Sequence, residues 1–230
     1  MTLKLTFILV GIAVAGVSFA DTLIYNPNLA TLPQAQGWTY FDNGFSPQPS
    51  VSGGILTHDS GAAGARWWER HTVNPIDFNA GASITADVRV ISSDYQPTGL
   101  QRAGYYLAMA DSAGRLAYVG ITSTGVFLLN DLTTIQSFVT MDTTSAFHTY
   151  SVKASANTIS LLVDNASVSS VGLGTANGGS YDNYVWFGAG TTSMRSDTRT
   201  KTVTFTSVPE PATFAILGLG LLGFRLRKRQ

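Results

Sequence analysis

The central part of the chain contains short segments in which apolar and polar residues alternate. In residues 83–90, the apolar residues Ile84, Ala86, Val88 and Val90 alternate with polar ones. Successive side chains of a β-strand project to opposite faces, so this pattern predicts a strand with one buried face. Away from the two ends, no long segment has apolar residues at helical spacing. We therefore expect an all-β domain.

Other segments rich in β-branched and aromatic residues are separated by turn-forming residues, which is typical of consecutive strands. Residues Asp111-Ser112-Ala113-Gly114 predict a hairpin link, and Asp164-Asn165 predict a tight turn because both residue types tolerate positive φ. The expected strands cover residues 66–71, 83–90, 103–110, 115–121, 125–129, 148–153, 158–163, 184–187 and 202–206. Many short strands at even spacing favour an antiparallel β-sandwich of the jelly-roll type.

The first segment of the chain, residues 1–20, does not fit the strand pattern. It combines the basic Lys4, an apolar run over residues 5–17, and small residues at Ser18 and Ala20. This composition is typical of a secretory signal peptide and predicts cleavage between Ala20 and Asp21. The alternative, an N-terminal membrane anchor, needs about 20 apolar residues, which is more than this run provides.

The last segment, residues 209–230, is also distinct from the middle. Pro209, Glu210 and Pro211 precede an apolar run over residues 212–224, and the basic residues Arg225, Arg227, Lys228 and Arg229 follow that run. As a helix, the run would span the membrane hydrocarbon only marginally. The basic cluster favours a cytoplasmic end by the positive-inside rule. The segment therefore predicts a short transmembrane helix, with the β domain on the other side of the inner membrane.

This order of motif, short apolar helix and basic cluster resembles the PEP-CTERM sorting signal. The resemblance implies that Pro209, Glu210 and Pro211 are recognised by an exosortase, a membrane enzyme with a cysteine nucleophile, and that the basic cluster is a stop signal. It also implies export, transient insertion in the inner membrane, and a final place on the cell envelope or in the extracellular matrix. The alternative is an ordinary tail anchor. The expected domains are thus a signal peptide at 1–20, a β-sandwich at 21–208 and a sorting tail at 209–230.

Charge and cysteine content narrow the function of the middle domain. Residues 21–208 contain nine basic and thirteen acidic residues, a net charge of −4. This balance argues against a nucleic-acid partner, because phosphate binding needs a clustered basic face. The chain contains no cysteine, which excludes disulfides, thiolate nucleophiles and cysteine-ligated metals.

A second pattern resembles late strands of the concanavalin A-like and laminin G-like sandwiches. It comprises residues 147–152, the segment from Ile159 to Asn165, and Val168, while residues 78–81 before the alternating strand resemble an earlier part of that superfamily. Asn165 stands where that superfamily usually has glycine, a change that the turn allows. The resemblance covers about residues 50–206 and implies a lectin-like sandwich.

Catalytic and metal-binding patterns are weak. Glycoside hydrolases need two carboxyl groups about 5–10 Å apart, and the middle domain contains one glutamate, Glu69, with no carboxylate partner on its strand. His58-Asp59-Ser60 looks like a triad, but neighbours along a strand alternate between faces and cannot form one. His148 is expected to begin a strand with a hydrogen-bonded ring. We expect no enzyme activity and no cofactor.

Calcium remains an alternative for the oxygen-rich turns, which hold the hard ligands that this ion prefers. Those turns include Asp42-Asn43-Gly44, Asn130-Asp131, Asp164-Asn165 and Tyr181-Asp182-Asn183. None has the fixed ligand spacing of a known calcium loop, and hydrogen bonding to the backbone explains such residues in turns without a metal.

The candidate ligand-binding residues are Arg66, Trp68 and Arg70, which share one face of a predicted strand, with Tyr106 and Tyr118 added from the hairpin. Of the two tryptophans at 67 and 68, we expect one in the core and Trp68, between two guanidiniums, as a platform for a sugar ring or an anionic polymer. The alternative is that Trp68 packs under the arginine stems without a ligand. Tyr181, Tyr184 and Trp186 form a second candidate.

Together these features predict a non-enzymatic, exported protein whose lectin-like domain binds a glycan such as an exopolysaccharide. A structural or adhesion module without glycan affinity is the first alternative. A glycan-active enzyme is the second, because a fold by itself does not determine function.

Overall fold

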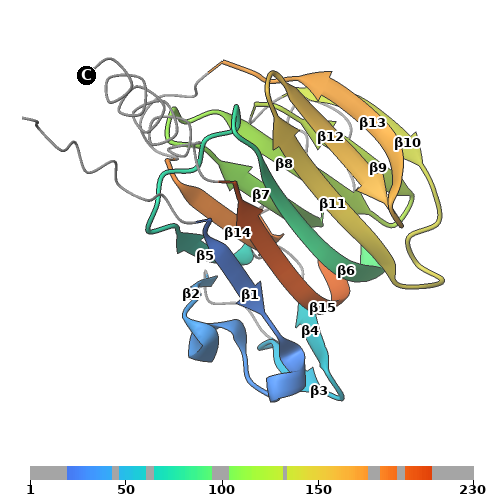
Figure 1. The fold of residues 1–230 in the computed structure, drawn as a ribbon. Coiled ribbons are helices and arrows are strands. Elements are labelled where there is room, and N and C mark those ends of the chain that lie inside the picture. Colours follow the sequence, from blue (N-terminus) through green and yellow to red (C-terminus); the bar gives the residue numbers. More distant parts are fainter. Residues whose placement is uncertain are drawn as a thin grey trace, which may run out of the picture. The chain divides into compact units, whose positions relative to one another are not determined.

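The computed structural model describes residues 20–42, 47–60, 65–94, 104–131, 134–175, 182–190 and 195–208. These residues form two antiparallel β-sheets that pack as two layers (Figure 1). The expectation of an antiparallel β-sandwich is confirmed. Two short 3-10 helices, η1 (Pro27–Leu29) and η2 (Pro33–Gln36), are the only helices of the described residues. Within that part of the chain, no helix is long and apolar enough to cross a membrane.

The first sheet has eight strands. Its order is β13 (Ala166–Gly172), β12 (Thr158–Val163), β11 (His148–Ser155), β6 (Ala82–Ser93), β15 (Ser196–Ser207), β4 (Ile55–Asp59) and β3 (Ser50–Ser52), and β1 (Thr22–Tyr25) also pairs with β15. The strand predicted from alternation is the central part of β6, and its Ile84, Ala86, Val88 and Val90 are all buried. The long pair of β6 and β15 forms the middle of this layer.

The second sheet has seven strands. Its order is β10 (Ile135–Thr140), β9 (Gly125–Leu129), β8 (Leu116–Thr122), β7 (Tyr105–Ala110), β14 (Tyr184–Ala189), β5 (Arg66–His71) and β2 (Thr39–Asp42). Every strand expected from the sequence is present in one of the two sheets, with end shifts of up to six residues, the largest at the start of β15. The sequence did not predict β1, β2, β3, β4, β10 or β13.

The two turns predicted from Asp and Asn residues are confirmed. Asp111 closes the β7–β8 hairpin: its Oδ1 accepts hydrogen bonds from the backbone N–H of Ala113 at 3.0 Å and of Arg115 at 2.9 Å. Asp164 and Asn165 both have positive φ and link β12 to β13. His148 begins β11, and its Nδ1 lies 2.7 Å from Asp164 Oδ2, so its ring is hydrogen-bonded as expected.

Aromatic rings fill one end of the core. This end lies between β14, β5 and β2 of the seven-stranded sheet and β4 of the eight-stranded sheet. The ring of Trp68 is fully buried. It stacks on Tyr40 with centroids 5.1 Å apart and on Phe187 at 5.4 Å, and its Nε1 donates to Gln34 Oε1 of η2 at 3.0 Å. Trp68 therefore ties the seven-stranded sheet to the connection between β1 and β2.

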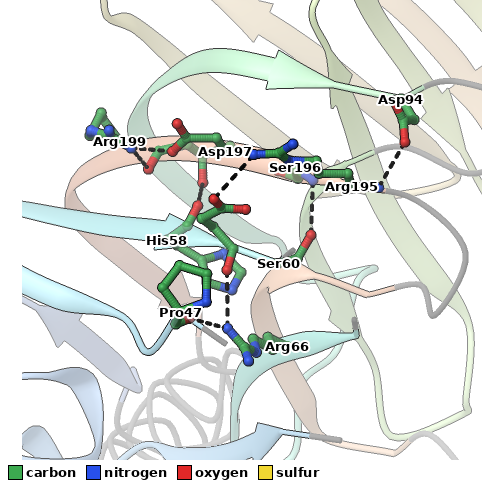
Figure 2. A network of polar contacts seen from close by, with 11 residues as sticks. Pro47, His58, Ser60, Arg66, Asp94, Arg195, Ser196, Asp197 and Arg199 are labelled. Carbon is green, nitrogen blue, oxygen red and sulfur yellow. Dashed lines mark hydrogen bonds and ion pairs between the residues drawn. The ribbon is translucent and has the colours of Figure 1, made fainter. Parts of the chain in front are cut away.

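A charged group is buried in the same region. Arg66 has a fully buried side chain whose Nε donates to Asp42 Oδ1 at 3.0 Å. Its Nη1 donates to the backbone oxygens of Asp59, at 3.0 Å, and of Pro47; Figure 2 shows these two contacts. A buried cation is tolerated because it is paired and hydrogen-bonded.

His58 lies in the same buried cluster, and its carbonyl oxygen accepts a hydrogen bond from Thr198 Oγ1 at 3.3 Å (Figure 2). Its ring makes an edge contact with Trp68, with centroids 5.1 Å apart, and neither ring nitrogen has a hydrogen-bond partner. Burial first, and then the nearby Arg66 charge, lower the pKa of His58 from 6.5 to about 4. His58 is therefore neutral in the folded protein at pH 7.

Residues 1–19 of the predicted signal peptide and the whole sorting tail, 209–230, lie outside the described residues. The two residues of the predicted cleavage site, Ala20 and Asp21, are described. Ala20 is exposed. Both Asp21 carboxylate oxygens accept hydrogen bonds from Asn74, from its backbone N–H at 2.9 Å and its side-chain amide at 2.8 Å. The predicted limits of the three domains stay predictions.

Trp68→Ala should lower the free energy of unfolding by about 3–5 kcal/mol, because it removes a large, fully buried ring and leaves a cavity. Trp67→Ala, the matched control on the neighbouring residue, should cost about 1–2 kcal/mol because its indole is only half-buried. Urea unfolding of the two variants measures both values. Equal losses would contradict the assignment of Trp68 to the core.

Stability should fall steeply as the pH drops from 6.5 to 4, because the unfolded chain protonates His58 in this range whereas the folded protein does not. The shift corresponds to about 3 kcal/mol lost by pH 4. In His58→Phe this part of the pH dependence should vanish, whereas His71→Gln, at an exposed histidine, should keep it. Unfolding curves measured across this range test the difference, and identical slopes in wild type and His58→Phe would show that His58 is not buried as a neutral ring.

Candidate functional site

Strand β5 places its side chains alternately on two faces with different environments. Arg66 and Trp68 face the other sheet and are fully buried. Arg70 is on the same side of β5, half-buried, and its Nη1 donates to the backbone oxygen of Gln36 at 3.4 Å. Trp67, Glu69 and His71 project from the opposite, outer side.

The expected ligand platform at Arg66, Trp68 and Arg70 is therefore wrong. The physical reason is that Arg66 has a half-buried counter-charge, Asp42, and with this partner a guanidinium can lie inside the sandwich next to a tryptophan. The expectation that one of the two tryptophans is in the core is confirmed, but the core residue is Trp68 and the outward one is Trp67.

Tyr106 and Tyr118 are brought together, but on the opposite side of the sheet from Arg66, Trp68 and Arg70. Their rings lie 5.7 Å apart between centroids, on the outer face of β7 and β8. Trp186 joins them, 6.0 Å from Tyr118, and Tyr184 lies 4.9 Å from Trp186. Two of the three residues of the second candidate thus share a face with Tyr106 and Tyr118, and Tyr181 lies outside the described residues.

We call the outer side of the seven-stranded sheet the aromatic face. The strand registers arrange its side chains in rows that run across the strands. One row is Phe41, Trp67, Gly188, Tyr106, Gly120, Phe127 and Phe138, and the next is Thr39, Glu69, Trp186, Ala108, Tyr118, Leu129 and Ile135. Rings thus occur in neighbouring positions on most strands of this sheet.

Two glycines make room for the rings of the first row. A Cβ on Gly120 would lie 2.2 Å from Cζ of Phe127, so the ring of Phe127 covers the bare backbone of β8. Gly188 has φ +125°, and a Cβ there would lie 2.7 Å from the backbone oxygen of Arg66. A side chain at Gly188 would therefore be strained, and the position between Trp67 and Tyr106 in the row carries no ring.

Exposure decreases across the aromatic face from β2 toward the middle strands. Phe41 is 41% exposed, whereas Trp186 is 8% and Tyr118 is 4% exposed. Trp67, Glu69 and Tyr184 are half-buried, and His71 is exposed. Phe138 of β10, at the opposite edge of the face, is 39% exposed as well. The accessible part around Glu69 lies on β2, β5 and β14.

Glu69 is held in place by two aromatic donors in this accessible part. Trp67 Nε1 donates to Glu69 Oε2 at 2.6 Å, and the hydroxyl of Tyr184 donates to the same oxygen. The indole nitrogen of Trp67 is also 3.2 Å from the Tyr184 hydroxyl. Phe41 stacks on Trp67 with centroids 3.9 Å apart, so the carboxylate and the rings form one fixed group.

The arrangement suits binding of a ligand with both apolar and hydroxyl-bearing surfaces. Aromatic rings supply flat contact area, and the Glu69 carboxylate and the Tyr184 hydroxyl supply directed hydrogen bonds. Within the described residues, no group of three or more His, Asp or Glu side chains could hold a metal ion. Asn43, Gly44 and Tyr181 of the possible calcium turns lie outside the described residues.

The sequence did contain a signal for this site. Period-two alternation places Trp67, Glu69 and His71 on one face of the strand, and that face is the outer one. The contributions of Phe41 and of the row geometry were not visible, because β2 was not predicted and strand order cannot be read from local sequence.

Comparison with known proteins identifies the end of the chain and the fold class. Residues 207–230 match the PEP-CTERM protein-sorting motif. No characterised protein matches the chain in sequence at a significant level. The three solved structures described next share 12% sequence identity or less with this chain, and similarity of that kind shows the fold alone.

The conserved carbohydrate esterase from the Shiga toxin-encoding bacteriophage phi24B has a TM-score of 0.55 and 12% identity, over 82% of this chain and 99% of that one. A sialidase has a TM-score of 0.51 and 12% identity, over 78% of this chain and 18% of the sialidase. A structure of botulinum neurotoxin type C has a TM-score of 0.50 and 9% identity, over 81% of this chain and 47% of the toxin chain. The chain is thus an antiparallel β-sandwich protein that carries a PEP-CTERM sorting signal at its C-terminus.

Proposed function

We propose that this protein is exported, processed by an exosortase, and binds a glycan of the cell envelope or extracellular matrix through its aromatic face. The observation that carries the glycan part is the group of Phe41, Trp67, Glu69 and Tyr184. It combines stacked rings with a carboxylate fixed by two hydrogen bonds from aromatic donors.

Sugar rings have an apolar side formed by C–H groups and an edge of hydroxyl groups. Aromatic side chains contact the C–H side of the sugar. Carboxylates accept hydrogen bonds from its hydroxyl groups, and protein hydroxyls accept or donate them. The Tyr184 and Trp67 donors fix the orientation of Glu69 before any ligand arrives, which reduces the entropy lost on binding. Similar folds occur in a carbohydrate esterase and a sialidase, which is compatible with a glycan ligand.

The proposed role is binding without catalysis. Among the described residues of the seven strands of this sheet, Glu69 is the only carboxylate on the outer face, since Asp42 is paired with Arg66 on the inner one. Hydrolysis of a glycosidic bond uses two carboxyl groups, and this face supplies one. Retention of a glycan is a function that the observed group can perform alone.

The sorting motif supports the proposed location. A PEP-CTERM signal implies a membrane-anchored precursor, cleavage near the motif by an exosortase, and export of the domain. A glycan-binding domain delivered in this way would meet polysaccharide at the cell surface or in the extracellular matrix.

Trp67→Ala should reduce glycan binding at least tenfold, because it removes the ring that stacks on Phe41 and donates to Glu69. Titration of the full chain, in mild detergent, against a panel of neutral, acidic and amino-sugar oligosaccharides measures the affinity. Circular dichroism checks that the variant is folded.

Phe138→Ala is the control, because it removes an aromatic side chain, 39% exposed, from the same face at the opposite edge of the sheet, away from the group around Trp67. Its affinity should stay within about twofold of wild type. If the wild-type protein binds no member of the panel and instead self-associates or binds envelope proteins, a structural or adhesion role replaces the glycan-binding one.

The sorting tail gives a separate prediction. Joint replacement of Pro209 and Pro211 by alanine should leave the protein in the membrane fraction with residues 209–230 still attached, because the recognition motif is lost. Cell fractionation and intact-mass measurement of the wild-type and variant proteins test this. A wild-type protein that keeps its full C-terminus in the native host would contradict exosortase processing.

A further inference from the structure

The charge of the aromatic face selects among possible glycans. The seven strands that form this sheet contain two arginines, Arg66 and Arg70, and no lysine. Both arginines lie on the inner side with Trp68. Glu69 is therefore the one carboxylate on the outer face of these strands, and no arginine or lysine of these strands lies on that face to offset its negative charge.

We propose that the preferred ligand is a glycan that contains hexosamine units with free amino groups, whose ammonium pairs with Glu69. This inference rests on the proposed glycan-binding function of the aromatic face and adds the chemical class of the sugar. This ligand class excludes polyanionic chains such as polyuronates. Those chains would have suited the platform predicted from the sequence, in which two arginines were expected beside Trp68.

The hydrogen bonds of Glu69 leave one carboxylate oxygen for the ligand. Both described donors, Trp67 Nε1 and the Tyr184 hydroxyl, bond to Oε2. The other oxygen, Oε1, has no hydrogen bond among the described residues, and the Glu69 side chain is half-buried rather than enclosed. An ammonium has three donors and no acceptor, so it matches an oriented carboxylate oxygen that lacks a competing cation.

The environment of Glu69 strengthens such a pair. Trp186 lies opposite Glu69 in the same row, and Trp67 and Tyr184 occupy the two adjacent rows. Such apolar neighbours reduce the screening of an ion pair by water. A cation stacked near these rings also gains from their electron-rich faces. His71 is the other residue of this face that can carry a charge, and its position follows Glu69 by two residues on the same strand.

The mild negative charge of the domain acts in the same direction. Residues 21–208 carry a net charge of −4, which attracts a polycation and repels a polyanion over distances of about a Debye length. This long-range contribution is general to the domain, whereas the pair at Glu69 is local. The two can be separated by a substitution that changes the net charge equally at another site.

The test compares glucosamine oligomers, N-acetylglucosamine oligomers and oligouronates of the same length, at a pH where the free amine is protonated. With the full chain in mild detergent, the glucosamine oligomer should bind about tenfold more tightly than its acetylated form. The oligouronate should bind least. The preference should decrease as salt is raised, because exposed charges are screened.

Glu69→Gln should abolish the preference for the free amine, because the glutamine oxygen can still accept from Trp67 and Tyr184 but the side chain carries no charge to pair with an ammonium. Asp87→Asn is the matched control. Asp87 lies in β6 of the other sheet, where it accepts a hydrogen bond from Thr149 Oγ1 at 2.6 Å, so this variant loses the same charge elsewhere and should keep the preference.

The outcomes separate the two proposals. Equal binding of free and acetylated oligomers, or tightest binding of the oligouronate, would overturn the amino-sugar inference and leave glycan binding in place. The same holds if Glu69→Gln and Asp87→Asn lower the preference equally, because the effect would then come from net charge. No binding of any oligomer would overturn the proposed function itself.

Discussion

The alternation of side chains along β5 is the constraint on which the rest of the structure depends. Arg66 and Trp68 occupy the inner face, so Trp67 and Glu69 must occupy the outer one. The inner pair is fixed by the Asp42 ion pair and by stacking of Trp68 on Tyr40 and Phe187. A shift of one residue in the register of β5 would bury Glu69 and expose Trp68, so the Arg66–Asp42 ion pair and the candidate site are two consequences of one register.

The sequence predicted most of the sandwich because its central strands have a clear pattern. β6 alternates without interruption, and the β7–β8 hairpin and the β12–β13 turn have side chains suited to their turns. β2, β3 and β4 are short strands that pair near the edges, where few residues are available to show a period. β13 is rich in serine and half-exposed, so its composition resembles a loop.

The site residues were predicted less well, for a reason that lies outside local sequence. Both faces of β5 contain an aromatic and a charged residue, so the alternation gives two faces but does not say which is buried. The decision rests on Asp42, which lies 24 residues before Arg66 in the chain and neutralises it inside the sandwich. Tyr106 and Tyr118 lie on adjacent strands of one hairpin and meet on the outer face, not beside Trp68 where the sequence placed them. Their association with Tyr184 and Trp186 depends on the position of β14 between β5 and β7.

The four tryptophans offer the most direct measurement of this division, because two lie on each side of the same sheet. Trp38 and Trp68 belong to the core, and Trp67 and Trp186 belong to the aromatic face. In a protein labelled with fluorotryptophan, titration with glucosamine oligomers should shift the fluorine resonances of Trp67 and Trp186 and leave those of Trp38 and Trp68 unchanged. A shift confined to Trp68, or no shift at Trp67 under conditions where the oligomer binds, would contradict the assignment of ligand binding to the outer face.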